Sequence, residues 1–276
     1  MTTSPDDLGS SGCQEARAAI RDSELTVIGR IRSASNATFL CEAQSASGDG
    51  VHCVYKPVRG EQPLWDFPDG TLAGREVATY LISAELGWNV VPYTVFRDGP
   101  AGFGMVQQWI HEPELAEGIP DLVDICLPEA LPPGYLPILR ALDADGAEIV
   151  LVHADNPLLR RMAVFDTLVN NADRKGGHIL RDADGGVFGV DHGICLHTHD
   201  KLRTVLWGWA GKPVESALLD DVAGLEQSLG GEFGATLAAH ITTDEVAALR
   251  QRAAMMLDAP VMPVPDSNRP IPWPAF

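Results

Sequence analysis

The stretch NNADRKGGHIL, residues 170–180, together with VDHG at 190–193, decides the fold that we expect for this chain. The first stretch places Asp-Arg-Lys and then a histidine on one short loop. The second ends a strand-like run on another aspartate, next to His-Gly. The elements on either side of these two stretches therefore determine which of their side chains can meet.

Regular elements are predicted on both sides of the loop. Before it, residues 156–171 carry apolar side chains in one helical stripe, formed by Leu158, Met162, Phe165 and Val169. After it, the runs HIL and VFGVD flank the turn DADGG and predict a β-hairpin. A helix thus delivers the chain to the loop, and the hairpin ends at Asp191.

The residues before position 111 predict an antiparallel sheet with one helix. Three β-prone runs, LTVIGRI, ATFLCEA and VHCVYKP, are separated by RSASN and by the hairpin turn QSASGDG. Apolar residues at near-helical spacing predict a helix over 68–87, which Gly87 can end. Two more strands, NVVPYTVF and GFGMVQQWI, flank the turn RDGPAG and complete a five-stranded sheet over 25–110.

The rest of the chain is predicted to be mainly helical. Residues 112–156 are rich in proline and acid, and we expect a connector there with room for one helix. Helices are predicted at 214–230 and 242–258, the second with Thr242 and Glu245 at capping-box spacing. The predicted fold is α+β with two lobes, and its parts are a polar leader (1–22), an N-lobe (23–111), a C-lobe (112–259) and a proline-rich tail (260–276).

Composition restricts the possible partners. A formal net charge of −18 repels nucleic acid and anionic lipid surfaces, since both are polyanions. The sequence has neither the pattern of a signal peptide nor a run approaching the roughly 18 apolar residues of a membrane span. Five scattered cysteines without a C-x-x-C pair indicate neither a zinc knuckle nor a disulfide framework. We therefore expect a cytoplasmic protein without stable membrane insertion and without a nucleic-acid partner.

The residue types that phosphoryl transfer requires occur here in chain order. The reaction needs a cation on the phosphates, a carboxylate that orients it, a group that positions the acceptor hydroxyl, and ligands for Mg²⁺. Lys56, in VYKP, lies on the third predicted strand, and Glu76, in GREVATYL, on the helix that follows. Asp173 is the candidate catalytic base, and Asp191 is the candidate metal ligand at the end of the hairpin.

This order of motifs resembles the phosphatidylinositol 3-/4-kinase-like superfamily, in particular type II phosphatidylinositol 4-kinases and HipA-type kinases. Those enzymes carry a strand lysine in V-[FY]-K-P, an R-E helix, an N-T-D-R-x-x-x-N catalytic loop and a D-x-G metal motif. The matching stretches are VYKP, GREVATYL, NADRKGGH and VDHG, and LWGWAGKPV at 206–214 resembles the tryptophan-rich segment of the type II lipid kinases. The chain also resembles a family of actinobacterial kinase-like proteins.

The resemblance implies a protein-kinase-like fold and a phosphotransferase that uses ATP and Mg²⁺. Lys56 would contact the α- and β-phosphates and pair with Glu76, Asp173 would position the acceptor, and Asp191 would hold the metal. The acceptor would be a hydroxyl of a small inositol-like polyol, a lipid headgroup or a protein, and the negative charge favours a soluble one. The hinge that reads the adenine would be the main chain at Gln107, Gln108 and Trp109.

Two segments depart from the family pattern. The loop expected to cover the phosphates, RSASNATF, lacks glycines, so its donors would come from Ser33, Ser35 and Asn36. The metal-binding Asn of the family is replaced by His178, a softer nitrogen ligand that suits Mg²⁺ less well and makes Mn²⁺ an alternative.

Other functions stay open on the sequence. The two departures are compatible with a nucleotide-binding pseudokinase that regulates a partner, and a kinase fold can also serve an adenylyl transferase that binds ATP reversed. A zinc hydrolase is a weaker alternative, because the stretch after the hairpin is rich in His and Asp but lacks the helical spacing of H-E-x-x-H. Its residues are Asp191, His192, His197, His199 and Asp200. Trp207 and Trp209 either stack on a substrate or pack in the core.

Overall fold

The N-terminal part of the chain is a five-stranded antiparallel sheet. In the computed structural model, which describes residues 11–31, 36–114 and 120–276, the strands lie in the spatial order β1, β2, β3, β5, β4. Every neighbouring pair is antiparallel, and the second half of β3 alternates buried and half-buried side chains. The predicted sheet is therefore confirmed, and its strands are β1 (Leu25–Arg30), β2 (Phe39–Gln44), β3 (Gly50–Pro57), β4 (Thr94–Gly99) and β5 (Gly102–Gln108).

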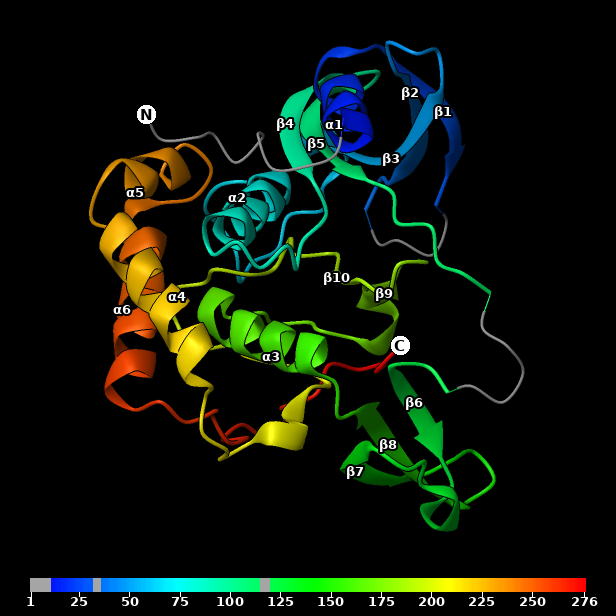
Figure 1. Cartoon of the computed structure of the whole chain (residues 1–276), viewed down its shortest axis with the longest axis vertical. Coiled ribbons are helices and arrows are strands. Elements are labelled where there is room, and N and C mark those ends of the chain that lie inside the picture. The colour runs from blue at the N-terminus through cyan, green and yellow to red at the C-terminus, as the bar shows by residue number, and fades with distance from the viewer. Residues whose placement is uncertain (1–10, 32–35, 115–119) are drawn as a thin grey trace.

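Two helices accompany this sheet (Figure 1). α1 (Ser11–Asp22) packs on the sheet and lies in the segment that the sequence suggested as a polar leader. α2 (Leu72–Glu85) lies between the sheet and the helical part, and it begins after Thr71, whose side chain accepts a first-turn amide at 2.9 Å. It ends before Gly87, whose φ of 66° favours glycine. The predicted helix over 68–87 is thus present.

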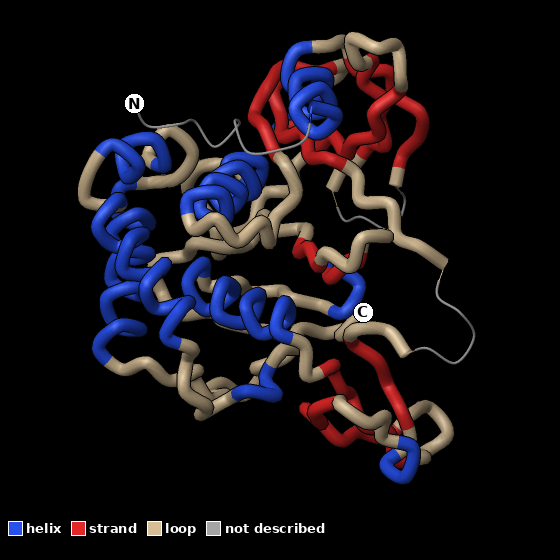
Figure 2. The backbone as a smooth tube through the Cα atoms, in the orientation of Figure 1, coloured by secondary structure: helices blue, strands red, loops and turns tan. Residues whose placement is uncertain are grey.

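A second sheet occupies the segment for which we expected a connector with room for one helix, so that expectation was wrong. Figure 2 shows its strands projecting from the helical part. The apolar run IVLV at 149–152 forms the central strand, and the prolines that argued against a sheet lie in turns or on an edge strand. Pro137 is on the edge strand β7, beside a register shift, where a missing amide costs little. The strands are β6 (Val123–Cys126), β7 (Tyr135–Leu142) and β8 (Glu148–Ala154), in the order β6, β8, β7.

The C-terminal part is mainly helical, as predicted. Asn156 caps α3 (Pro157–Val169) by accepting the Leu158 amide at 2.8 Å, and the helix ends at Asn170, which has a left-handed backbone. The predicted capping box of Thr242 and Glu245 is present at the start of α6. The predicted hairpin is also formed. The remaining elements are β9 (Ile179–Arg181), β10 (Val187–Gly189), α4 (Ser216–Ser228), α5 (Glu232–Leu237) and α6 (Thr243–Asp258).

One continuous cluster of buried side chains runs from the sheet through α2 and α3 into the helical part. The proline-rich tail after Asp258 follows the helical part back toward β9, where Figure 1 places the C-terminal end. No helix in the part of the chain that the structure describes is long and apolar enough to cross a membrane.

Candidate functional site

Three elements bring Lys56, Glu76 and Asp191 together, as the sequence predicts. The Nζ atom of Lys56, on β3, donates to Glu76 Oε1 at 2.5 Å and to Asp191 Oδ1 at 2.7 Å. Glu76, on α2, is 2% exposed, and its second carboxylate oxygen accepts the His192 amide at 3.2 Å. Asp191 follows β10 with a φ of 61°, a left-handed backbone that Asp tolerates better than most residues.

The charges of these residues stabilise one another. Burial alone would lower the pKa of Lys56, but Asp191 and Glu76 raise it above its ordinary value. Lys56 in turn lowers the pKa of Asp191. Burial raises the pKa of Glu76, against the opposing effect of Lys56. At neutral pH the cleft therefore presents a charged ammonium group next to an ionised, half-exposed carboxylate.

His178 and Asp191 face each other beside Lys56. The Nδ1 atom of His178 lies 3.0 Å from the Asp173 carbonyl oxygen, which can only accept, so Nδ1 carries the proton. Burial lowers the pKa of His178, so its ring is neutral and Nε2 presents a lone pair. That lone pair faces Asp191 Oδ2 at 3.5 Å. Two acceptors that face each other without a proton between them fit a divalent cation.

The protein supplies only part of a metal coordination shell. Within the described ranges, no group of three or more His, Cys, Asp and Glu side chains is arranged to hold a metal ion. A cation at His178 and Asp191 would therefore take further ligands from phosphate oxygens and water, as Mg²⁺ usually does in kinase-type sites.

Asp173 lies on the loop below this cluster. Its amide donates to Asn171 Oδ1 at 3.0 Å, and its carboxylate is 3.2 Å from the Nζ atom of Lys175. The Asp173 carboxylate is partly exposed and faces the same cavity as Lys56. The sequence analysis assigned no role to Lys175. Its position two residues after Asp173 on the same loop could have indicated that it pairs with this carboxylate.

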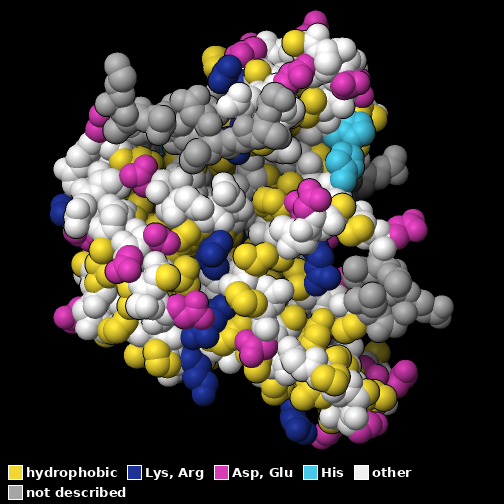
Figure 3. Space-filling view, viewed as in Figure 1, with side chains coloured by type: hydrophobic (Ala, Val, Ile, Leu, Met, Phe, Trp, Pro, Cys, Tyr) yellow, Lys and Arg dark blue, Asp and Glu magenta, His cyan; other side chains and the backbone are white. Residues whose placement is uncertain are grey.

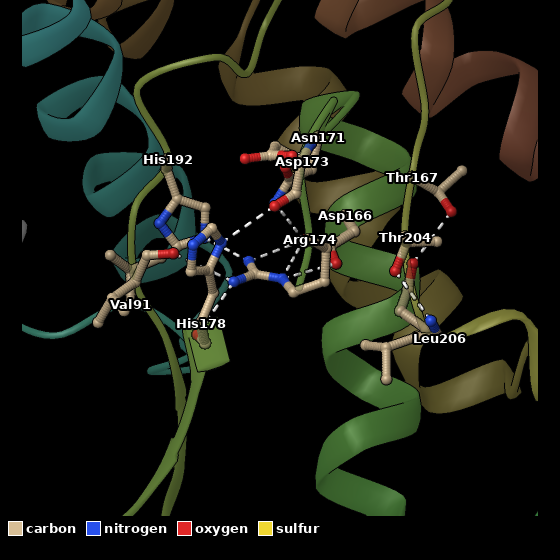
Figure 4. Close-up of polar contacts among 12 residues, drawn as sticks. Val91, Asp166, Thr167, Asn171, Asp173, Arg174, His178, His192, Thr204 and Leu206 are labelled. Atoms are coloured by element: carbon tan, nitrogen blue, oxygen red, sulfur yellow. Dashed lines mark hydrogen bonds and ion pairs between the residues drawn. The ribbon is translucent and has the colours of Figure 1, made fainter. Parts of the chain in front are cut away.

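Arg174 is buried behind the loop and connects its parts (Figure 4). It binds Asp166 of α3 through two contacts of 2.9 Å, Nε to Oδ2 and Nη2 to Oδ1. Its Nη2 atom also donates to His192 Nε2 at 2.7 Å, and Nη1 donates to the carbonyls of His178 and Val190 at 3.2 Å. Burial would lower the pKa of Arg174, but Asp166 raises it. One arginine thus ties α3, the loop and the Asp191 segment together.

Two cavities meet at Lys56 and Asp191. The larger, of about 450 Å³, extends toward β5, and the smaller, of about 250 Å³, extends toward the start of α2; both are also lined by Thr38. The larger is lined by apolar and aromatic side chains, among them Val54, Trp109 and Phe276, together with polar ones, whereas the smaller contains Glu61, Glu76 and Asp173. An elongated ligand with a flat base at one end and phosphates at the other matches this division.

The predicted hinge lines the larger cavity but needs a correction. Gln107, Gln108 and Trp109 all face it. The amides of Gln108 and Trp109, however, donate to the carbonyls of Tyr93 at 2.8 Å and His52 at 3.1 Å. Because the sheet already uses these two amides, they are not free to read a base. Ile110, which lines the same cavity, carries the next amide along the chain.

The remaining predicted residues are placed as follows. Asn36 lines the smaller cavity, and its Oδ1 atom accepts the Gln62 amide at 2.8 Å. Ser33 and Ser35 lie outside the described residues. Trp209 is buried and donates to Asp155 at 3.0 Å, and Trp207 donates to the Pro270 carbonyl at 2.9 Å. Trp209 also packs on the ring of His153 of β8 with 4.3 Å between centroids, so both tryptophans make structural contacts.

The histidines considered for zinc have other contacts. His192 accepts from Arg174, and the ring of His197 packs edge-on against Phe67 with 5.1 Å between centroids. The loop that carries His197 and His199 is held by Asn170, whose side chain donates to both of their carbonyls. These contacts explain the stretch as structural and do not support a zinc hydrolase.

Arg75 holds α2 in the position that Glu76 requires. It precedes Glu76 and is buried, and its Nη2 atom donates to Glu245 Oε1 at 2.5 Å. Its Nη1 atom donates to the Cys195 carbonyl at 3.0 Å. α2 is thus fixed to α6 and to the segment after Asp191, and it keeps Glu76 directed at Lys56.

Glu245→Gln should lower the free energy of unfolding by about 2 kcal/mol, because hydrogen bonds to charged groups contribute about 1.5–3 kcal/mol and Arg75 would lose its buried counter-charge. Urea unfolding followed by circular dichroism measures this change. The matched control is Asp244→Asn, on the exposed side of the same first turn, which should change stability by less than about 0.5 kcal/mol. Equal stability of both variants would show that the Arg75–Glu245 ion pair does not stabilise the position of α2.

Comparisons with known proteins identify a close relative and similar folds. No family model matches the sequence. The chain is 61% identical over 267 residues to Protein Rv2133c of Mycobacterium tuberculosis, which covers 95% of this chain and 96% of that protein. Its fold is similar to the structure of hydra Fam20 with sugar, with a TM-score of 0.52 and 14% identity over 91% of this chain and 89% of that chain.

It is also similar to the crystal structure of the Golgi casein kinase with Mn/ADP bound. The TM-score is 0.51 at 12% identity, over 90% of this chain and 76% of that chain. At such identities the likeness shows the fold alone. The expected kinase-like fold, with an N-terminal antiparallel sheet and a helical C-terminal part, is therefore confirmed.

Proposed function

The chain belongs to the family of Protein Rv2133c of Mycobacterium tuberculosis, and from this premise and its kinase-like fold we propose that it is a phosphotransferase that uses ATP and a divalent metal. The observation that carries the proposal is the contact of Lys56 with both Glu76 and Asp191 where the two cavities meet. Phosphoryl transfer needs a cation and a metal ligand at the phosphates, between the site of the base and the site of the acceptor.

Each residue has a chemical role in this proposal. Lys56 binds phosphate oxygens, and Glu76 keeps its ammonium group in place. Asp173 accepts or orients the hydroxyl of the acceptor, while Lys175 holds the Asp173 carboxylate. Asp191 and His178 hold the divalent metal, which when bound neutralises charge on the phosphates.

The nitrogen ligand favours Mn²⁺ over Mg²⁺. Mg²⁺ prefers oxygen ligands in strict octahedral geometry, whereas an imidazole nitrogen binds Mn²⁺ more readily. The similar Golgi casein kinase structure has Mn and ADP bound. We therefore expect higher nucleotide affinity with Mn²⁺ than with Mg²⁺ at equal metal concentration.

The acceptor in this proposal is a soluble compound with a hydroxyl group. On the face drawn in Figure 3, Asp and Glu side chains are spread over both parts of the molecule, in keeping with the net charge of −18. An anionic bilayer would repel such a surface. The finer resemblance to type II lipid kinases stays a prediction, and we favour a soluble polyol or protein hydroxyl over a bilayer lipid.

ATP with Mn²⁺ should raise the melting temperature by about 5–10 °C at a hundredfold excess over Kd, because binding to the native state stabilises it by about 2.7 kcal/mol. Lys56→Ala and Asp191→Asn should lose most of this shift, since each removes a group that faces the phosphates. Differential scanning fluorimetry measures it. The matched control is Lys212→Ala, an exposed lysine outside both cavities, which should keep the full shift.

The outcomes separate the possible functions. If no nucleotide shifts the wild type, the site does not bind nucleotides and the proposal fails. If ATP binds, incubation with α- or γ-labelled ATP and candidate acceptors distinguishes the reactions. Transfer of the γ-label supports a phosphotransferase, and transfer of the α-label indicates an adenylyl transferase. Binding without either transfer indicates a regulatory nucleotide-binding protein.

A further inference from the structure

The C-terminal segment returns to the cleft and is fixed there. The Pro270 carbonyl accepts the Thr204 amide at 3.0 Å and the indole Nε1 of Trp207 at 2.9 Å. Farther along, the Ala275 carbonyl accepts the Gly176 amide at 2.8 Å. Gly176 lies on the same loop as Asp173, so the tail reaches this loop, and Figure 1 places the C-terminal end near β9.

The ring of Phe276 packs on Gly176. A Cβ atom added at Gly176 would lie 2.5 Å from Cε1 and 2.7 Å from Cδ1 of Phe276, closer than atoms in contact can approach. A side chain at Gly176 would therefore displace the ring from its present position. Phe276 is nevertheless 48% exposed, and it lines both the larger cavity and a neighbouring one on the side of β6 and β9.

That cavity has the walls that a flat aromatic base needs. Ile31 and Val54 line it from the sheet, and Leu180 and Val190 line it from the hairpin. Phe276 lines the same cavity from the loop that precedes the hairpin, where it packs on Gly176. A base held between two apolar surfaces gains burial on both faces, and an aromatic ring adds stacking.

We propose that Phe276 is a base-recognition residue, which packs its ring against the adenine of the bound nucleotide. This inference rests on the proposed nucleotide site and adds to it a residue from the opposite end of the chain. The proline-rich tail is then a structural part of the cleft, since its anchors at Thr204, Trp207 and Gly176 set the position of the ring.

Isothermal titration of ATP and of inorganic tripolyphosphate, both with Mn²⁺, tests the inference. Phe276→Ala should weaken ATP binding by roughly tenfold, since stacking of a base on an aromatic ring typically contributes 1–3 kcal/mol. Tripolyphosphate has no base, so its affinity should not change. Phe276→Tyr, which keeps the ring, should bind ATP like the wild type. The matched control is Trp273→Ala, an 86% exposed aromatic of the same segment that does not line the cavity.

Any of the following results would overturn the inference. Equal ATP affinity in Phe276→Ala would show that the ring does not contact the base. Tighter ATP binding would show that the ring competes with the nucleotide. An equal loss of ATP and tripolyphosphate affinity would show a general effect on the cleft. If the wild type binds tripolyphosphate but not ATP, the site for the base is contradicted. If it binds neither ligand, the proposed function is contradicted as well, so the two failures are distinguishable.

Discussion

Asp173→Asn should reduce the rate of phosphoryl transfer by about 10²- to 10⁴-fold and leave nucleotide affinity and folding nearly unchanged. The amide has the size of the carboxylate, but it cannot accept the proton of an acceptor hydroxyl. The side chain is partly exposed and has one ion-pair partner, Lys175, so its replacement leaves no buried charge behind. Steady-state ADP release with Mn²⁺, ATP and the acceptor found in a transfer screen gives kcat and KM.

The kinetic pattern distinguishes catalysis from binding. Loss of kcat with an unchanged KM for ATP indicates a group that acts on the acceptor in the transition state. The matched control is Asp184→Asn, an exposed aspartate on the β9–β10 turn, which should keep full kcat. An Asp173→Asn enzyme as fast as the wild type would show that another group positions the hydroxyl, and the assignment of Asp173 would be wrong.

The convergence of Lys56, Glu76 and Asp191 could be predicted because motif order and element order agree. A strand lysine, a helix glutamate and an aspartate at the end of a hairpin meet in one cleft once the sheet packs on the helical part. The structure places the lysine within 2.5 and 2.7 Å of the two carboxylates. The motifs depend on local spacing, and the sequence displays such spacing directly.

The hinge was less predictable because strand register decides which amides are free. MVQQWI correctly indicates a strand, and that strand lines the larger cavity. The amides at Gln108 and Trp109 are used by neighbouring strands, however, and a register of this kind depends on pairing with residues far away. The spacing of residues within one segment carries no information about the register with which its strand pairs.

Two further features depend on tertiary contacts that local pattern does not encode. The strands of the second sheet contain one proline, and only their pairing shows that Pro137 occupies a tolerant edge position. Phe276 contacts Gly176 although the two are far apart in sequence. Gly176 and Gly177 stand next to each other in the loop, and glycine permits a close approach of another group. The local sequence does not indicate which group that is.

Asp166→Ala should lower the free energy of unfolding by about 3–5 kcal/mol, because it leaves the fully buried Arg174 guanidinium without its counter-charge. The two side chains are both 0% exposed, so water cannot replace the lost contact. Urea unfolding measures the change. The matched control is Thr167→Ala on the same helix, which loses one hydrogen bond to the Ala163 carbonyl and should cost about 1 kcal/mol.

A double variant separates the cost of the unpaired charge from the cost of a cavity. Asp166→Leu with Arg174→Met leaves neither charge buried and restores apolar volume, so it should recover much of the stability that Asp166→Ala loses. If stability is not recovered, the main cost of Asp166→Ala lies in packing rather than in the unpaired arginine. A loss below about 1 kcal/mol in Asp166→Ala itself would contradict the ion-pair argument.

The same double variant tests why the chain keeps a buried ion pair at this place. Arg174 also donates to His192 and to the carbonyls of His178 and Val190, contacts that methionine cannot make. Replacement of a buried pair by apolar side chains often preserves folding, so stability alone does not explain its presence. A variant that folds but transfers no phosphoryl group would assign the pair to positioning the His178 and Asp191 segments beside Asp173. A double variant with the phosphoryl-transfer rate of the wild type would show that the Asp166–Arg174 pair has only a structural role.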